Sequence, residues 1–163
     1  MKIICVSGSV GSGKTTLSKK LAKSLKFEYL DVTNEIKKNK LSSGFDEKNK
    51  CEIIDEKKLI KFLVEKIKKA KKSLVIDSIF SHLISKKYVD LCIVMTCEID
   101  VLRDRLKKRK YSPEKIKENI EVEIFDSFVI EAKEKKHSLL VVNTTKGYKI
   151  KEIINYLTQL QGL

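Results

Sequence analysis

The stretch "SGSVGSGKTT", residues 7–16, holds three of the six glycines in this 163-residue chain, Gly8, Gly11 and Gly13. Glycine loses more conformational freedom on folding than any other residue, so this concentration indicates a backbone with a special task. An apolar run, "KIICVSG" (2–8), precedes the stretch, and leucines at helical spacing follow it between Thr15 and Leu25. A G-x4-G-K-T pattern between a strand and a helix is typical of a loop that wraps phosphate with its backbone N–H groups. The stretch therefore predicts a nucleotide site.

Two side chains of this loop carry the predicted chemistry. Lys14 is expected to reach the β- and γ-phosphates of the nucleotide, and the Thr15 hydroxyl is expected to hold Mg²⁺. The following helix adds N–H donors and the positive end of its dipole. The alternative is a tight turn that needs glycine for its geometry alone, and the strand–loop–helix setting favours the nucleotide site.

Five apolar runs alternate with helical patterns along the chain. The runs expected to form buried strands are 2–8, 27–32, 73–78, 90–95 and 138–144. The segments expected to form helices are 15–25, 56–71, 99–108, 113–136 and 150–160, with Asp55 and Ser112 as N-caps. Strands this apolar, separated by helices, predict an α/β fold with a five-stranded parallel sheet flanked by helices. Residues 33–55 are polar and show no clear pattern.

Length and charge narrow the class of protein. A chain of 163 residues with 42% hydrophobic residues is expected to fold as one domain, residues 1–163. The formal net charge of +13 favours partners that carry phosphate, such as nucleotides or RNA. Lysine runs such as "EKIKKAKK" (65–72) have helix-like spacing, so solvation of helix faces is the open alternative.

The four cysteines, Cys5, Cys51, Cys92 and Cys97, show no metal-ligand spacing. Cys5 and Cys92 lie in apolar runs, which predicts small, buried, reduced thiols. No run approaches 18 apolar residues, and no signal peptide is expected before the first strand. We therefore expect a protein of the cytoplasm without a membrane partner.

Two further segments point to phosphoryl transfer. Ras-type GTPases select their base with N-K-x-D, which this sequence lacks. Residues 33–55 stand where a nucleoside monophosphate kinase has its acceptor-binding segment, and residues 105–115 stand where it has its lid. Arg105 and Arg109 are expected to be catalytic, because a closing basic lid stabilises the transferring phosphoryl group and excludes water. Arg103 is expected to solvate a helix face.

The chain resembles the adenylate kinase isoenzyme 6 family, also called the coilin-interacting nuclear ATPase family, which has archaeal members among the P-loop nucleoside monophosphate kinases. The resemblance spans nearly the whole chain. The stretches that carry it are "GSVGSGKTTLSKKLA" (8–22), "GFDEKNKCEIIDE" (44–56), "LVIDSIFSHLI" (74–84) and "RLKKRKYSPEKIKENIEVEIF" (105–125). It implies a small adenylate kinase of broad specificity that uses ATP and Mg²⁺, has ATPase activity and takes part in maturation of the small ribosomal subunit.

The resemblance also assigns roles to single residues. The positions that match the ATP-binding loop are Gly11, Ser12, Gly13, Lys14, Thr15 and Thr16. Asp77 matches an aspartate that orders the water around Mg²⁺, with a turn cap as the alternative, and Arg109 matches a nucleotide-binding lid arginine. Asn34 and Lys37 stand where the acceptor segment has an acidic residue and an arginine. Lysine lacks the bidentate fork of arginine, so AMP is expected to bind more loosely or with altered specificity.

Three positions depart from the family pattern. Lys110 replaces the glycine that follows the lid arginine, so lid flexibility is expected to differ. Ile79 replaces a histidine two residues after the aspartate, which predicts weak hydrolysis of ATP by water. His82, at a second histidine position, either takes over that role or is structural, and His137 is expected to cap or to be solvated.

Three functions remain open on the sequence. The leading one is transfer of phosphate from Mg·ATP to AMP or another nucleoside monophosphate. The second is an ATP-dependent assembly factor that binds a small-subunit ribosomal protein or rRNA, which the charge of +13 favours. The third is a P-loop kinase with another small-molecule acceptor.

Overall fold

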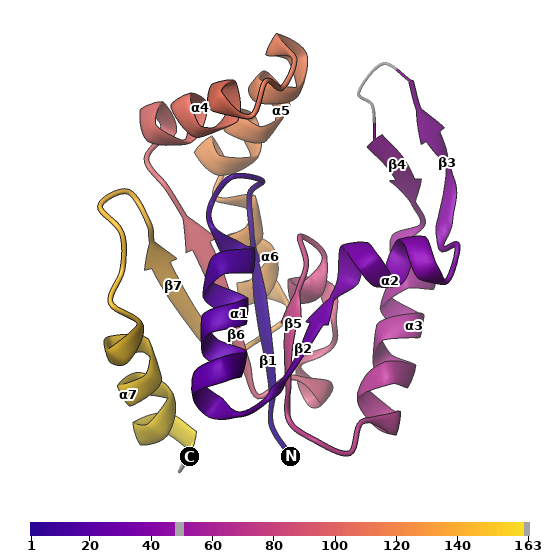
Figure 1. The fold of residues 1–163 in the computed structure, drawn as a ribbon, viewed down its shortest axis with the longest axis vertical. Coiled ribbons are helices and arrows are strands. Elements are labelled where there is room, and N and C mark those ends of the chain that lie inside the picture. Colours follow the sequence, from indigo (N-terminus) through magenta and orange to yellow (C-terminus); the bar gives the residue numbers. More distant parts are fainter. Residues whose placement is uncertain (48–50, 162–163) are drawn as a thin grey trace.

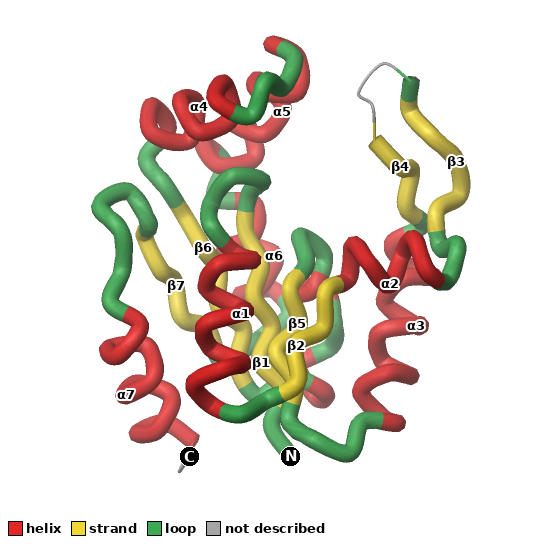
Figure 2. The backbone as a smooth tube through the Cα atoms, in the orientation of Figure 1, coloured by secondary structure: helices red, strands yellow, loops and turns green. Residues whose placement is uncertain are grey.

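A five-stranded parallel sheet forms the centre of the computed structural model, which describes residues 1–47 and 51–161 (Figures 1 and 2). Its order is β2-β5-β1-β6-β7. The strands are β1 (Ile3–Gly8), β2 (Glu28–Asp31), β5 (Leu74–Asp77), β6 (Leu91–Thr96) and β7 (Leu139–Asn143). This confirms the predicted fold, and each strand lies within two residues of its expected bounds.

The sheet is covered on both faces because its strands send alternate apolar residues to opposite sides. In β1, Ile4 and Val6 pack with helices α1 (Lys14–Leu25) and α7 (Ile150–Gln161). Ile3 and Cys5 pack with α2 (Val32–Lys38), α3 (Glu56–Lys69) and α6 (Ser127–Glu134). Leu59, Leu63 and Ile67 in α3 repeat every four residues, which turns one helix face to this second core.

Strand β1 is the point at which the strand order changes direction: it pairs with β5 on one side, and the next strand, β6, is added on its other side. In open α/β sheets, ligands bind at such a point, beyond the carboxyl ends of the strands. The loop between β1 and α1 begins at this edge of the sheet. Asp77, the last residue of β5, lies at the same edge.

Helices α4 (Ile99–Lys108) and α5 (Pro113–Ile124) lie above this edge and share a third apolar cluster with Val10 of the loop (Figure 1). As predicted, the Ser112 side chain caps α5 and Pro113 is its first residue, and Asp55 caps α3. The prediction of one helix over 113–136 is wrong. Asp126 adopts a left-handed conformation, with φ 49°, and separates α5 from α6.

The polar stretch 33–55 without a clear pattern folds mainly as α2 and a hairpin of β3 (Ser42–Asp46) and β4 (Cys51–Ile54). The hairpin stands beyond the same end of the central sheet as α4 and α5, across from these two helices (Figure 1). Short 3₁₀ turns η1 (Ser81–Leu83) and η2 (Lys86–Tyr88) connect β5 to β6. The part of the 44–56 stretch at 48–50 lies outside the described residues.

Cys5 and Cys92 are buried free thiols, as predicted, and Cys97 is a third. The side chain of Cys51 lies outside the described part of the chain. No helix within residues 1–47 and 51–161 has the length and apolar character to cross a membrane.

Candidate active site

The loop between β1 and α1 has the backbone that its glycines predicted. Gly8 has φ 131°, and a side chain there would overlap the carbonyl group of Met95. Gly13 is the N-cap of α1 in a left-handed conformation, with φ 96°, and no side chain caps this helix. The first N–H groups of α1 are therefore available to an anion, as a phosphate-binding loop requires.

Lys14 lies half-buried at the start of α1, where its Nζ donates to the carbonyl oxygen of Ser9 at 2.9 Å. The pKa of this ammonium is lowered to about 8: burial is the largest cause and Arg109 adds to it, whereas Asp77 and Glu123 oppose the shift. The nearby carboxylates do not fully offset the cost of burying the Lys14 charge, so binding of an anion next to it is favourable. The loop and Lys14 therefore fit the phosphates of a nucleotide.

Asp77 and Thr15 fit a magnesium ion beside those phosphates. Asp77 is buried at the end of β5, and its Oδ2 accepts a hydrogen bond from the Tyr29 hydroxyl at 2.9 Å. Burial and the bonded carboxylate raise the pKa of Tyr29, and its contact with the Thr15 hydroxyl opposes that rise. Mg²⁺ is usually held by one or two carboxylates together with substrate phosphates, and this set of oxygens suits that arrangement.

An open cleft of about 970 Å³ runs from the loop to α2 and the hairpin. The sequence-predicted site residues that line it are Gly11, Gly13, Lys14, Thr15, Thr16, Asn34, Lys37, Asp77 and Arg109. Ser12 and Arg105 are not among the described lining residues. The structure thus brings together nine of the predicted site residues, from four separate segments.

The two predicted catalytic arginines have different surroundings. Arg109 is the C-cap of α4, is exposed and lines the cleft. Arg105, one helical turn earlier, donates to the carbonyl oxygen and hydroxyl of Thr144 at 2.7 and 3.0 Å. The Thr144 hydroxyl also lies 3.0 Å from the Ser12 carbonyl oxygen. Arg105 therefore braces the loop from behind, whereas Arg109 faces the space where phosphates would lie.

The acceptor side of the cleft mixes polar and apolar groups. Asn34 donates through its side-chain and backbone N–H groups to the Asp31 carboxylate at 3.0 and 3.1 Å. Lys37 lies one turn further along α2, and Phe45 in β3 is about half exposed, at 52%. The Lys37 amine beside an apolar surface that includes Phe45 suits a planar base carrying a phosphate.

The structure also shows where the two histidines lie and where the chain departs from the family pattern. Ile79 lines the cleft, whereas His82 is only 2% exposed and lies outside it. His137 is buried and its Nε2 donates to the His82 carbonyl oxygen at 2.9 Å, so it caps the turn. Lys110 has φ 57°, the left-handed conformation that favours the family's glycine.

Two residues near the loop were missed at the sequence level. Glu123 in α5 is buried and accepts hydrogen bonds from the Ser9 hydroxyl and from the backbone N–H of Cys97, the latter at 2.8 Å. Tyr29 holds Asp77 from the edge strand β2. The only signal for Glu123 was its place in the "NIEVEIF" stretch (119–125), because its partners are distant in the sequence.

The strand order, the glycine-rich loop and the cleft beyond the strand ends define a P-loop kinase. The chain has the fold of shikimate kinase from Acinetobacter baumannii, with a TM-score of 0.65 at 16% identity, covering 99% of this chain and 94% of that one. A family model described as "AAA domain" matches residues 4–126.

Curated relatives give the family. An adenylate kinase isoenzyme 6 homolog of Caenorhabditis elegans is 37% identical over 80% of this chain and 72% of its own length. A homolog of the same name from Schizosaccharomyces pombe is also 37% identical, over 85% of this chain and 78% of its own. The chain belongs to the adenylate kinase isoenzyme 6 family, and it is a phosphotransferase of the kinase class.

Proposed function

We propose that this protein is an adenylate kinase that transfers the γ-phosphoryl group of Mg·ATP to AMP. The observation that carries the proposal is one cleft that has Lys14 and Arg109 on one side and Asn34 and Lys37 on the other. Two nucleotides bound to these sides would bring the donor and acceptor phosphates together between them. The name of the relatives, adenylate kinase, supports AMP as the acceptor.

The residues of the chain would act mainly through charge and position. Phosphoryl transfer needs little covalent chemistry from the protein, so aligned cations supply most of the rate. Lys14 and Arg109 would meet the transferring group, and Thr15 and Asp77 would hold Mg²⁺. When bound, Mg²⁺ neutralises charge on the β- and γ-phosphates. We further propose that 105–115 is the lid and 33–55 the acceptor segment of a single domain, 1–163.

The acceptor is tested by measuring ADP formation from ATP with a panel of nucleoside monophosphates. AMP is expected to give the highest kcat/KM. Nucleoside monophosphates with other bases are expected to give kcat/KM values lower by up to a few tens of fold. Shikimate serves as a small-molecule control, since the fold alone is shared with shikimate kinase. A panel in which no nucleoside monophosphate reacts would remove this proposal and favour another small-molecule acceptor.

We also propose that hydrolysis by water is weak compared with transfer to AMP. Ile79 offers no proton acceptor in the cleft, and His82 has both ring nitrogens bonded outside it. Ile79→His is expected to raise ATPase turnover without an equal rise in kinase turnover, and His82→Ala is expected to leave hydrolysis unchanged. Strong hydrolysis in the wild type that neither variant alters would contradict this proposal.

A second candidate function is an ATP-dependent factor that binds small-subunit rRNA or a ribosomal protein. The net charge of +13 is the observation that favours it, and such a role would be compatible with a cytoplasmic protein. Binding of small-subunit rRNA fragments should then fall steeply with salt, because lysine–phosphate contacts release counterions. No binding at low salt would leave the lysines as solvating residues.

A further inference from the structure

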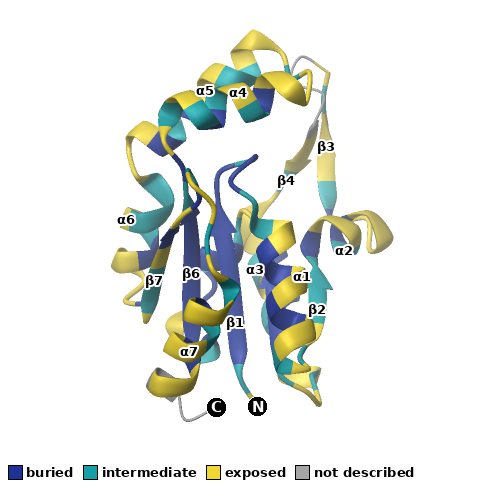
Figure 3. Ribbon diagram, turned by 60° about the vertical axis from the view of Figure 1, so that its left-hand side comes forward, coloured by how far each residue is buried: buried dark blue, intermediate teal, exposed yellow. Residues whose placement is uncertain are grey.

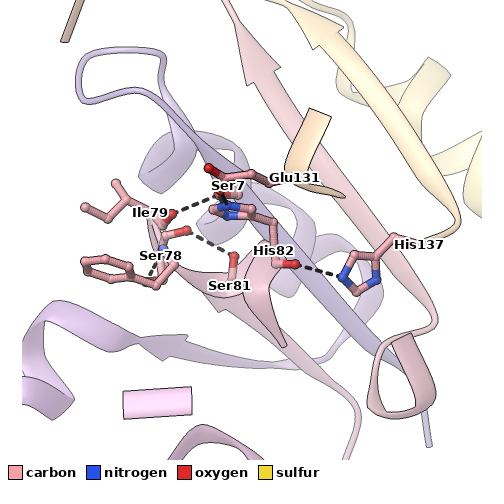
Figure 4. A network of polar contacts seen from close by, with 8 residues as sticks. Ser7, Ser78, Ile79, Ser81, His82, Glu131 and His137 are labelled. Atoms are coloured by element: carbon pink, nitrogen blue, oxygen red, sulfur yellow. Dashed lines mark hydrogen bonds and ion pairs between the residues drawn. The ribbon is translucent and has the colours of Figure 1, made fainter. Parts of the chain in front are cut away.

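A buried polar network lies directly behind the wall of the cleft formed by Ser78, Ile79 and Phe80 (Figure 4). The Ser7 hydroxyl lies 2.8 Å from Nδ1 of His82, and Nε2 of His82 lies 2.6 Å from the Glu131 carboxylate. We name this the Ser7–His82–Glu131 network. It joins β1 to α6 through the turn that follows Asp77.

The network is buried at one end and solvated at the other. Ser7 and His82 are 0% and 2% exposed, whereas the Glu131 side chain is 46% exposed. Buried polar groups must be hydrogen-bonded to avoid a large cost, so His82 needs both partners to remain in place. The ring of Phe128 packs edge-on against the imidazole at 5.1 Å and fixes its plane. The turn that carries Ile79 is therefore tied to two separate elements through one side chain.

Counting protons shows which bonds can exist together. The Glu131 carboxylate is an acceptor, so Nε2 of His82 carries a proton. In the neutral ring, Nδ1 then accepts the single proton of the Ser7 hydroxyl. In the imidazolium, Nδ1 becomes a donor to Ser7 Oγ, and the Ser7 proton is free for the carbonyl oxygen of Ile79, 3.3 Å away.

Charged groups around the imidazole set which form is present. Burial lowers the pKa of His82 and His137 lowers it further, whereas Glu131 of α6 and Glu56 of α3 oppose the shift. The net direction is downward, so the neutral ring is the form at neutral pH. Ile79 faces the cleft, and its backbone carbonyl faces Ser7.

We propose that the wall formed by Ser78, Ile79 and Phe80 contacts the acceptor, and that His82 is a positioning residue for this acceptor wall: it fixes the turn 78–82 against β1 and α6, and its protonation adds a Ser7–Ile79 bond that tightens the wall. This inference rests on the proposed nucleoside monophosphate kinase function. His82 itself does not touch substrate, and its effect reaches the acceptor through Ile79. Affinity for the acceptor should therefore depend on this network, whereas affinity for ATP should not.

Two isosteric variants separate the two bonds of His82. His82→Asn keeps an acceptor near Nδ1 for Ser7, and His82→Gln keeps a donor near Nε2 for Glu131. The KM for AMP should rise about fivefold in His82→Gln and in Ser7→Ala, as expected for one buried hydrogen bond. It should rise by no more than about twofold in His82→Asn, because the bond to Glu131 lies at the solvated end of the network and contributes less. The double variant Ser7→Ala/His82→Gln should also show about a fivefold rise, rather than the product of two independent losses. The kcat and the KM for ATP should remain unchanged.

The pH dependence adds a second kinetic test. A phosphate monoester such as that of AMP has a second pKa of about 6, so Ser7→Ala serves as the baseline at each pH. The ratio of its AMP KM to that of the wild type should widen as the pH falls well below 6.5, because the pKa of His82 is lowered from that value and only the wild type can gain the Ser7–Ile79 bond. An equal KM rise in the Asn and Gln variants, a parallel change in the KM for ATP, or a constant ratio with pH would overturn the proposal.

Nitrogen NMR of the imidazoles tests the network without any catalysis, and the chain has only two histidines to resolve. Neutral His82 should carry its proton on Nε2, and its Nδ1 shift should move in Ser7→Ala. A neutral ring protonated on Nδ1, or an Nδ1 shift that Ser7→Ala leaves unchanged, would overturn the inference. Should the wild type phosphorylate no nucleoside monophosphate, the proposed function fails while this spectrum still decides whether the network exists.

Discussion

The phosphate-binding loop and the β3–β4 hairpin face the same cleft, but they are built in opposite ways (Figure 3). The loop is buried and braced from behind by Glu123, Thr144 and Arg105. The hairpin is largely exposed, with Phe45 at 52% and Ile53 at 49%. In Figure 3 the loop is mostly dark blue, whereas β3 is mostly yellow.

The contrast separates a preformed half of the site from an adaptable half. A braced loop presents its N–H groups to phosphate without a cost of ordering, which suits a donor that must be aligned. A hairpin with few buried contacts opens at a low free energy, so it can adjust to the acceptor. The donor side should therefore determine the rate, and the acceptor side should determine specificity.

The sharpest test of the donor side is Lys14→Ala. Loss of this cation should lower kcat by on the order of 10³-fold, as for removal of one preorganised stabilising group. The pKa of Lys14 is lowered to about 8 in the fold, so its charge opposes folding at neutral pH and that cost fades above pH 8. Thermal melting of the variant at pH 7 should therefore match or exceed that of the wild type. An unchanged kcat in Lys14→Ala would contradict a role of this loop in phosphoryl transfer.

The two arginines should respond differently to truncation, since Arg109 faces the cleft and Arg105 braces the loop. Arg109→Ala should lower kcat by on the order of 10²-fold with a smaller change in the KM for ATP. Arg105→Ala should instead lower the melting temperature and raise the KM for ATP, because Thr144 and the loop lose their support. Arg103→Ala, at an exposed ion pair with Asp100, is the matched control and should change neither. Equal kcat losses at Arg105 and Arg109 would erase this distinction.

The protonation of Lys14 should appear in nucleotide binding. Bound phosphates raise the pKa of Lys14 from about 8, so ATP binding takes up a proton above that pH. The Kd for ATP should increase about tenfold between pH 7 and pH 9 because the free enzyme loses its cation there. Calorimetry at pH 8.5 in two buffers with different ionisation enthalpies measures the proton taken up. The weaker binding of Lys14→Ala should lack both effects, and a pH-independent wild-type Kd would contradict the assignment.

The smallest effect is expected on the adaptable side. Lys37→Arg restores a bidentate phosphate donor in α2, so the KM for AMP should fall about threefold while kcat and the KM for ATP stay constant. Lys38→Arg, the next residue in the same helix, is the control because it does not line the cleft. A change in the KM for ATP instead would place Lys37 on the donor side and break the division between the two halves.

The parts predicted from the sequence are those whose signal is local. Gly8, Gly13 and Lys14 lie within seven residues, and apolar runs identify the five strands of the central parallel sheet. The hairpin and the break at Asp126 were not predicted. The periodicity through Ile120 and Ile124 continues across the break, yet Ile124 is 57% exposed because α5 ends there. Helical spacing alone cannot show whether an apolar residue has a partner.

The sequence by itself determined the fold class and the phosphate-binding loop, because each depends on neighbours within a few positions. The residues expected to meet ATP and Mg²⁺ stay predictions, and Asp77 was assigned through the family resemblance. Only the tertiary structure decided that Arg105 supports the loop while Arg109 faces the cleft, and that Tyr29 holds Asp77. It also decided that His82 lies behind the wall, bonded to Ser7 and Glu131, which are 75 and 49 residues away in the chain. Such contacts depend on how helices pack across a sheet, and a periodic pattern in one segment does not encode which distant group it will face.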